Sequence, residues 1–391
     1  MRASPGIDRG SRSTGRAFAA LVLILAVAGC GGGPASPSSS LGPTASPSPT
    51  LAPTSAPSPT PAHGTFTVTG SMSADRTHDT ATLLGNGRVL IVGGLIHNAA
   101  AVASAESYDP ATGKFGATIS MSKPRAYQAA ALLSSGSVLV AGGLDNTAEL
   151  YDPATGTFSP TGSLVSGGQT ATLLADGRVL IVGGGDGGNT AEVYDPASGS
   201  FGLTGSMKTG RSNFTATRLG DGRVLIVGGQ GADDESLASA EIYDPATGKF
   251  SPTGSMRTAR TDFAATLLAN GQVLVAGGLG DSGALVSVEL YDPATGKFTP
   301  TGSMHDARQY FTATLLTNGQ VLVAGGGNDD SISLALAELY NPATGTFTPT
   351  GSMITARNGQ TATLLADGWV LIAGGQAPDG SDLPSAELYW P

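Results

Sequence analysis

The sequence predicts an all-β protein, a seven-bladed β-propeller of four-stranded blades, and three observations support this fold class. Only 13% of the 391 residues are charged and 58 are glycine, a composition poor in helix formers and rich in turn formers. A strand-like apolar run that ends in Gly-Gly occurs seven times, with the glycine pairs beginning at 93, 142, 183, 228, 277, 325 and 374. A spacing of roughly 40 to 50 residues is typical of propeller blades.

Each repeat contains two turn signals that divide it into four short antiparallel strands. An Asp-Gly or Asn-Gly pair, such as Asp176-Gly177, separates the first two apolar runs, and such a pair favours a two-residue hairpin because both central positions need positive φ. Ser135-Gly136 is the one departure. The second signal is Asp-Pro-Ala-Thr-Gly, in which proline fixes φ early in the turn.

The second run of each repeat, for example VLIV over residues 179–182, is apolar without alternation. This pattern indicates a strand that is covered on both faces. In a propeller, the neighbouring blades provide that cover.

Two aromatic series predict how the ring closes. A phenylalanine opens each fourth strand and a tyrosine ends each third strand, and each series has seven members, from Phe66 to Phe347 and from Tyr108 to Tyr389. The folded part therefore begins with a fourth strand over residues 65–72 and stops after a third strand over 386–389. We expect these two strands to pair in one blade, which removes the exposed edges.

The amino terminus is similar to a bacterial lipoprotein signal over residues 1–30. Four arginines precede an apolar run over 17–28, and small residues lead to Cys30, the single cysteine of the chain. A plain secretory signal or a membrane span are the alternatives, but the run is short for a bilayer. We expect lipidation at Cys30, and hence a secreted protein anchored outside the cytoplasm to the bacterial cell membrane by acyl chains.

Residues 31–62 are rich in Pro, Ser and Thr, which predicts a disordered linker before a propeller over 63–391. The formal net charge is −10. Nucleic acids and anionic membrane surfaces require clustered positive charge, so neither is an expected partner of the propeller. We expect a monomer.

These repeats resemble kelch repeats, closest to the galactose-oxidase-like variety, throughout the chain after the linker. The resemblance implies that the loops after Gly-Gly and the loops that enter each blade share one face. It also implies that arginines of the entering loops can take an acidic peptide ligand. The third blade has Ser166 at this position. The other six blades carry an arginine there, namely Arg76, Arg125, Arg211, Arg260, Arg308 and Arg357.

A structural role for these arginines is the alternative. Every third strand carries a glutamate, from Glu106 to Glu387, and a carboxylate between blades needs a partner because its burial is costly. Pairing within or between blades is the favoured interpretation. It leaves Glu192 of the third blade without an arginine.

The residues two and three positions after each arginine, or after Ser166, vary while the repeat around them does not. Aromatic rings beside amides and carboxylates around a channel suit a sugar or a peptide, although the same side chains can simply fill the channel. The candidate ligand-binding residues at these positions are His78, Asp79, Tyr127, Gln128, Gln169, Asn213, Phe214, Asp262, Phe263, Tyr310, Phe311 and Gln360.

No metal or other cofactor is expected. Galactose oxidase chemistry requires two tyrosines, two histidines and a cysteine joined to one tyrosine, whereas the one cysteine here belongs to the anchor signal and the four histidines include no close pair. His78 and His97 alone make a weak metal site.

The sequence therefore favours a cell-surface recognition or scaffolding module that binds a glycan or an extracellular protein, without catalytic residues. The alternative is a carbohydrate-active enzyme similar to kelch-type sialic acid epimerases, in which His78, Asp79, Asp262 and the arginines act as acid, base and anion clamp. A structural spacer is the third possibility. Fold alone does not choose among them.

Overall fold

The computed structural model describes residues 62–96, 100–116, 119–183, 188–329 and 332–391. Within these ranges every helix or strand element is a β-strand, and none is a helix that could span a membrane. The predicted signal over 1–30, Cys30 and nearly all of the predicted linker lie outside the described residues.

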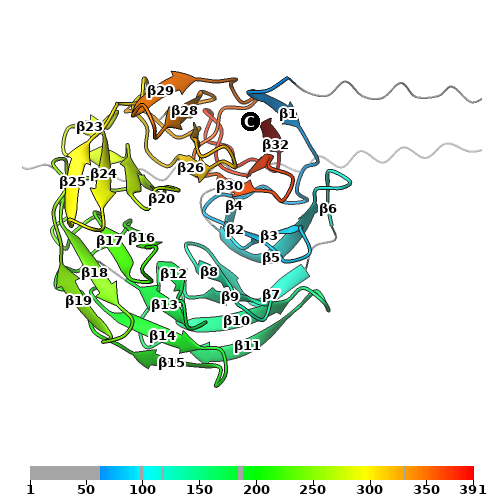
Figure 1. Ribbon diagram of the computed structural model, residues 1–391. Helices are drawn as coiled ribbons and strands as arrows, with labels where there is room; N and C mark the ends of the chain where they lie inside the picture. Colours follow the sequence, from blue (N-terminus) through cyan, green and yellow to red (C-terminus); the bar gives the residue numbers. More distant parts are fainter. Residues whose placement is uncertain (1–61, 97–99, 117–118, 184–187, 330–331) are drawn as a thin grey trace, which may run out of the picture. The chain divides into compact units, whose positions relative to one another are not determined.

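Seven sheets are arranged around a common axis as the blades of a propeller (Figure 1), and we refer to the region around this axis as the pore. The innermost strands are β2 (Thr80–Leu83), β8 (Ala129–Leu132), β12 (Thr170–Leu173), β16 (Thr215–Arg218), β20 (Ala264–Leu267), β26 (Thr312–Leu315) and β30 (Thr361–Leu364). The second strands are β3 (Val89–Val92), β9 (Val138–Ala141), β13 (Val179–Val182), β17 (Val224–Val227), β21 (Val273–Ala276), β27 (Val321–Ala324) and β31 (Val370–Ala373). All residues of these second strands are buried, as their unbroken apolar pattern predicts.

The third strands are β5 (Ala100–Asp109), β10 (Thr147–Asp152), β14 (Ala191–Asp195), β18 (Ala240–Asp244), β24 (Val288–Asp292), β28 (Ala337–Asn341) and β32 (Ala386–Trp390). The outer strands are β6 (Lys114–Phe115) with β7 (Ile119–Arg125), β11 (Thr157–Ser163), β15 (Ser200–Leu203), β19 (Lys249–Pro252), β25 (Lys297–Pro300), β29 (Thr346–Pro349) and β1 (Thr65–Val68). Shorter pieces, β4 (Leu95–Ile96), β22 (Leu279–Gly280) and β23 (Gly283–Ala284), lie in loops after Gly-Gly.

The ring closes as the sequence predicts. β1 pairs antiparallel with β32, from Thr65 opposite Trp390 to Val68 opposite Glu387, and the innermost strands contact one another in an unbroken cycle from β2 through β30 and back to β2. β1 ends at Val68 rather than at residue 72. Beyond it the backbone alternates between blades, since Gly70 N–H donates to Gly113 O of the next blade at 2.9 Å whereas Met72 N–H donates to Pro384 O of its own blade at 2.8 Å.

The hydrophobic core lies between blades. In one such layer Leu274 of β21 packs with Val321 of β27 and Tyr340 of β28. The buried tyrosine of each third strand stacks on the phenylalanine of the outer strand, as in Phe66 and Tyr389 with ring centroids 4.8 Å apart. In six of the blades its hydroxyl bonds to a threonine of the preceding blade, at 2.9 Å for Thr350 and Tyr389, so these rings are buried without an unsatisfied polar atom.

The antiparallel order gives the propeller two faces. The loop face holds the segments after Gly-Gly and the segments that enter each innermost strand. The turn face holds the Asp-Gly hairpins and the Asp-Pro turns. The candidate residues all belong to the entering segments, and therefore to the loop face.

Candidate functional site

The six arginines are buried and paired inside their own blades. Arg260, for example, is completely buried, and its guanidinium donates to the carbonyls of Gly277 and Ser287 at 2.6 and 2.9 Å and to Glu289 at 3.4 Å. The other five make the same pattern, with the carboxylate 3.0 to 3.4 Å away. These contacts are the ones that a structural pairing role predicts, so the guanidinium groups are not available to a ligand in the pore. This holds for Arg76, Arg125, Arg211, Arg260, Arg308 and Arg357.

The third blade lacks the arginine, and its buried glutamate keeps backbone hydrogen bonds of the kind that the glutamates of the other blades also accept. Glu192 accepts hydrogen bonds from the backbone N–H groups of Val165 and Ser166 at 3.0 and 3.1 Å. The Ser166 hydroxyl bonds to the Thr190 hydroxyl at 2.6 Å.

The residues two positions after each arginine form what we call the pore ring, made of His78, Tyr127, Gly168, Asn213, Asp262, Tyr310 and Gly359. Backbone hydrogen bonds join neighbouring members, such as Tyr310 N–H to Asp262 O at 3.1 Å and Gly359 N–H to Tyr310 O at 2.8 Å. Each blade therefore places one residue at the same level of the pore, and five of the seven carry a side chain.

Most members of the pore ring have a strained backbone. Five non-glycine residues, His78, Tyr127, Asn213, Asp262 and Tyr310, have φ between 51° and 56°. This left-handed conformation costs most residues with a Cβ about 1–2 kcal/mol, and asparagine and aspartate less. The equivalent Gly359 adopts φ 62° without that cost. Side chains persist where glycine fits the fold better, which is the pattern expected when strain serves a function.

Aromatic rings of the pore ring face one another. The rings of His78 and Tyr127 lie 4.4 Å apart at 33°, and Tyr310 meets His78 edge-on at 6.4 Å. Tyr127 is 53% exposed and Tyr310 is 41% exposed. Rings that merely filled the channel would be buried, so the exposed sides of Tyr127 and Tyr310 are available to a ligand.

The residues three positions after each arginine lie against the Gly-Gly pair of the preceding blade. Phe214, Phe263 and Phe311 are buried in the core between blades, so these three candidates have a packing role. A Cβ on Gly228 would lie 2.7 Å from the Phe263 ring. This close approach, together with positive φ at both glycines, explains why the repeat requires Gly-Gly.

The other members of this set are polar. Gln128 and Gln360 are buried, and their amide nitrogens donate to Val92 O at 2.7 Å and Ala324 O at 2.9 Å. Gln169 accepts a hydrogen bond from Asn213 N–H at 3.2 Å. Asp79 is 8% exposed, and neither of its carboxylate oxygens has a hydrogen-bond partner among the described residues.

Burial shifts the pKa values of titratable side chains in and beside the pore ring. Desolvation raises the pKa of Asp79 to about 7, although Arg76 opposes the change. Desolvation also raises the pKa of Asp262 to about 6, against hydrogen bonds from Thr261 and Tyr310, and raises that of Tyr310 to about 12. The pKa of His78 is lowered by burial, which favours the neutral imidazole.

A cavity of about 260 Å³ opens beside this part of the pore ring. Its lining comes from four consecutive blades and consists of His78, Asp79, Tyr127, Gln128, Gln169, Thr170, Asn213 and Phe214. All except Thr170 are predicted candidates. Sequence patterns also missed Asp382, a buried residue of a loop after Gly-Gly whose charge acts on His78, because these loops share no alignment from blade to blade.

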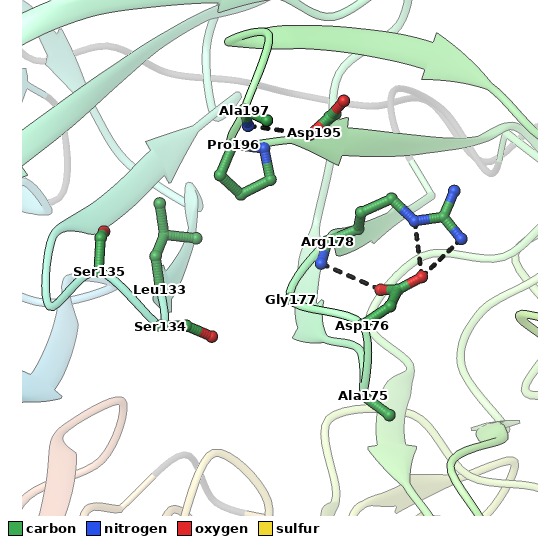
Figure 2. A pocket seen from close by; sticks show the side chains of 10 residues that line it. All are labelled: Leu133, Ser134, Ser135, Ala175, Asp176, Gly177, Arg178, Asp195, Pro196 and Ala197. Carbon is green, nitrogen blue, oxygen red and sulfur yellow. Dashed lines mark hydrogen bonds and ion pairs between the residues drawn. The ribbon is translucent and has the colours of Figure 1, made fainter.

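The turn face has cavities of a different kind. Figure 2 shows one between two blades, where Ser134, Asp176 and Pro196 lie around it and the Arg178 side chain is bound to Asp176 rather than to the opening. Equivalent turn residues line cavities at two other blade boundaries. A feature that repeats with the blades follows from their packing, so these cavities are weaker candidates than the loop-face cavity.

The comparisons with known proteins agree with this architecture. Residues 211–257 and 260–305 match the Kelch motif family. Among solved structures, the chain is similar to a fungal alcohol oxidase of the AA5 family in complex with copper, with TM-score 0.69, 19% identity and coverage of 83% of this chain and 75% of that chain. At that identity the likeness shows the fold alone. No curated protein matches the chain.

The described residues do not fit a copper centre. No three His, Cys, Asp or Glu side chains converge within the described part of the chain. The His63 ring bonds to Pro391 O and to Trp390, and the His305 ring bonds to Glu338. His97 and Cys30 lie outside the described residues.

Proposed function

Because the chain is a seven-bladed β-propeller with kelch repeats, we propose that it is a recognition module that binds a glycan at the loop-face cavity. The observation that carries this proposal is the left-handed backbone of five pore-ring residues, which keeps side chains where glycine would fit at lower cost. Aromatic faces beside amide and carboxylate groups are the chemistry that binds sugars.

The dimensions agree with a small ligand. A volume of about 260 Å³ is near the lower end of small-molecule sites, which begin at roughly 300 Å³. One sugar ring at the end or branch of a glycan suits this space. Tyr127, which lines the cavity and is 53% exposed, supplies an apolar face to the ligand.

We propose that the module works outside the cytoplasm, held at the bacterial membrane by lipid on Cys30. The basic start, short apolar run and sole cysteine support this location. The full chain should partition into detergent, and Cys30→Ala should remain in the aqueous phase. Partitioning of Cys30→Ala into detergent would contradict the lipid anchor.

A glycan array tests the recognition function. The full chain should bind one group of glycans, and Tyr127→Gly should abolish binding while the fold is retained. Ile354→Ser is the matched control, because Ile354 is 61% exposed in an entering segment of the loop face but lies outside the cavity lining. Absence of glycan binding, or equal loss with both variants, would refute the proposal.

One observation favours an enzyme as the second candidate. Asp262, whose pKa is raised to about 6, is bonded to Tyr310 within the pore ring, and a carboxyl group with such a pKa suits acid–base chemistry near neutral pH. Turnover of a bound sugar that Asp262→Asn abolishes without loss of binding would favour the enzyme. Retention of an unchanged sugar favours the recognition module.

A further inference from the structure

Three consecutive blades place buried hydrogen-bond acceptors beside one another. Gln360, Asp79 and Gln128 occupy equivalent positions of the last, first and second blades, and they are 6%, 8% and 4% exposed. The amide nitrogen of each glutamine is bonded to a backbone carbonyl. Because only the nitrogen can donate to a carbonyl, each amide oxygen points away from that bond.

The Gly-Gly pairs show that these side chains follow one another around the pore, with one glycine pair between each two. A Cβ on Gly93 would lie 2.8 Å from Gln128 Nε2, and a Cβ on the adjoining Gly94 would lie 3.1 Å from Asp79 Cβ. On the other side of Asp79, a Cβ on Gly374 would lie 3.4 Å from its Oδ1. Only a glycine pair separates Asp79 from each glutamine.

This row of acceptors lacks donors. The two Asp79 oxygens and the Oε1 atoms of Gln128 and Gln360 are buried without a hydrogen-bond partner among the described residues. A buried acceptor without a partner costs about 1–3 kcal/mol. Asp79 and Gln128 both line the loop-face cavity. Because their acceptor oxygens have almost no exposed surface, a ligand in the cavity supplies the donors once these side chains shift toward it.

The chemistry of the row selects the ligand. A primary ammonium group carries three N–H donors and no acceptor, and it complements one carboxylate flanked by amide oxygens. The Tyr127 ring lies on the cavity wall, packs against His78 at 4.4 Å on one side and is 53% exposed. Its outer face attracts both a cation and the apolar side of a sugar ring.

We infer that the ligand is an amino sugar with a free primary ammonium group, which Asp79 and Gln128 receive while the ring packs on Tyr127. Gln360 lies on the other side of Asp79 and adds a further acceptor oxygen to the row. This inference rests on the proposed glycan-binding function and specifies its substrate class.

Titration calorimetry on the full chain tests the inference with a matched pair of probes, a β-1,4-linked glucosamine trisaccharide and its N-acetylated form. The free amine should bind about tenfold or more tightly, since a charged hydrogen bond contributes more than a neutral one. Asp79→Asn should abolish this preference by weakening the amine form alone. Asp281→Asn, which removes an exposed loop-face carboxylate outside the cavity, should preserve it.

The outcomes separate the two proposals. Equal or tighter binding of the N-acetylated form, or an unchanged preference in a folded Asp79→Asn protein, would overturn the amino-sugar inference while glycan recognition stands. Equal binding of trilysine would also overturn it, because the site would then read an ammonium group without a sugar. If neither trisaccharide nor any other glycan binds, the proposed function itself fails.

Discussion

Replacement of Asp79 by glutamine should stabilise the folded protein, and the gain should grow as the pH rises. The repeat itself provides this variant, because Gln128 and Gln360 occupy the same position in other blades and donate to the carbonyl before Gly-Gly. For a glutamine at position 79 the corresponding acceptor is Ala373 O, which precedes the Gly-Gly pair of the last blade. The substitution also removes the buried carboxyl group.

The magnitude follows from the shift of the Asp79 pKa from 3.8 to about 7. Below the unfolded pKa both states hold the proton, so the carboxyl contributes no pH dependence. As the pH rises from about 4 to about 7, the unfolded chain loses the proton first, and the free energy of unfolding falls. About three pKa units correspond to at most about 4 kcal/mol, since each unit is about 1.4 kcal/mol.

The neighbours of Asp79 do not reverse this sign. Arg76, the charged group that acts on Asp79, lowers its pKa but is outweighed by desolvation. His78, the next residue toward the pore, has a lowered pKa and is therefore largely neutral above pH 6.5.

Urea unfolding of the wild type and Asp79→Gln at pH 5, 6, 7 and 8 measures the effect. The difference in the free energy of unfolding should widen between pH 5 and 7 and then level off. Asp281→Gln, which changes an exposed carboxylate, should follow the wild type. Parallel curves for wild type and Asp79→Gln across this range would refute the assignment of a buried, poorly partnered carboxyl group at this position.

Three further predictions concern the repeat and the pore ring. Arg260→Met should lower the free energy of unfolding by about 3–5 kcal/mol by leaving the Glu289 carboxylate buried without its cation, and a second change, Glu289→Leu, should recover most of the loss in chemical denaturation; no recovery would contradict the pairing. Gly94→Ala should cost about 1–3 kcal/mol, because φ is +101° and the new Cβ would lie 2.8 Å from Thr77 O; an unchanged melting temperature would argue against this geometry. Tyr127→Gly should retain stability or gain up to about 1 kcal/mol from relief of the left-handed strain while glycan binding is lost, and a large destabilisation would show that the ring is a packing element.

The sequence alone determined the fold because the features that specify a blade are local and repeated. The Asp-Gly and Asp-Pro turns set the strand ends, and the unbroken apolar second strands required cover on both faces. Two aromatic series with seven members each then predicted the pairing of β1 with β32, since an open edge is unfavourable. The structure confirms each of these predictions.

The role of each loop-face side chain depended on tertiary structure, because residues equivalent in sequence have different surroundings. Phe263 and Asp79 are equivalent in the repeat, yet one fills the core between blades and the other is a buried carboxyl group beside a cavity. The arginine pattern was compatible with ligand contact or pairing until the guanidinium–carboxylate distances were known. Burial and hydrogen-bond partners arise only when blades pack together, and these decide which polar groups remain available to a ligand.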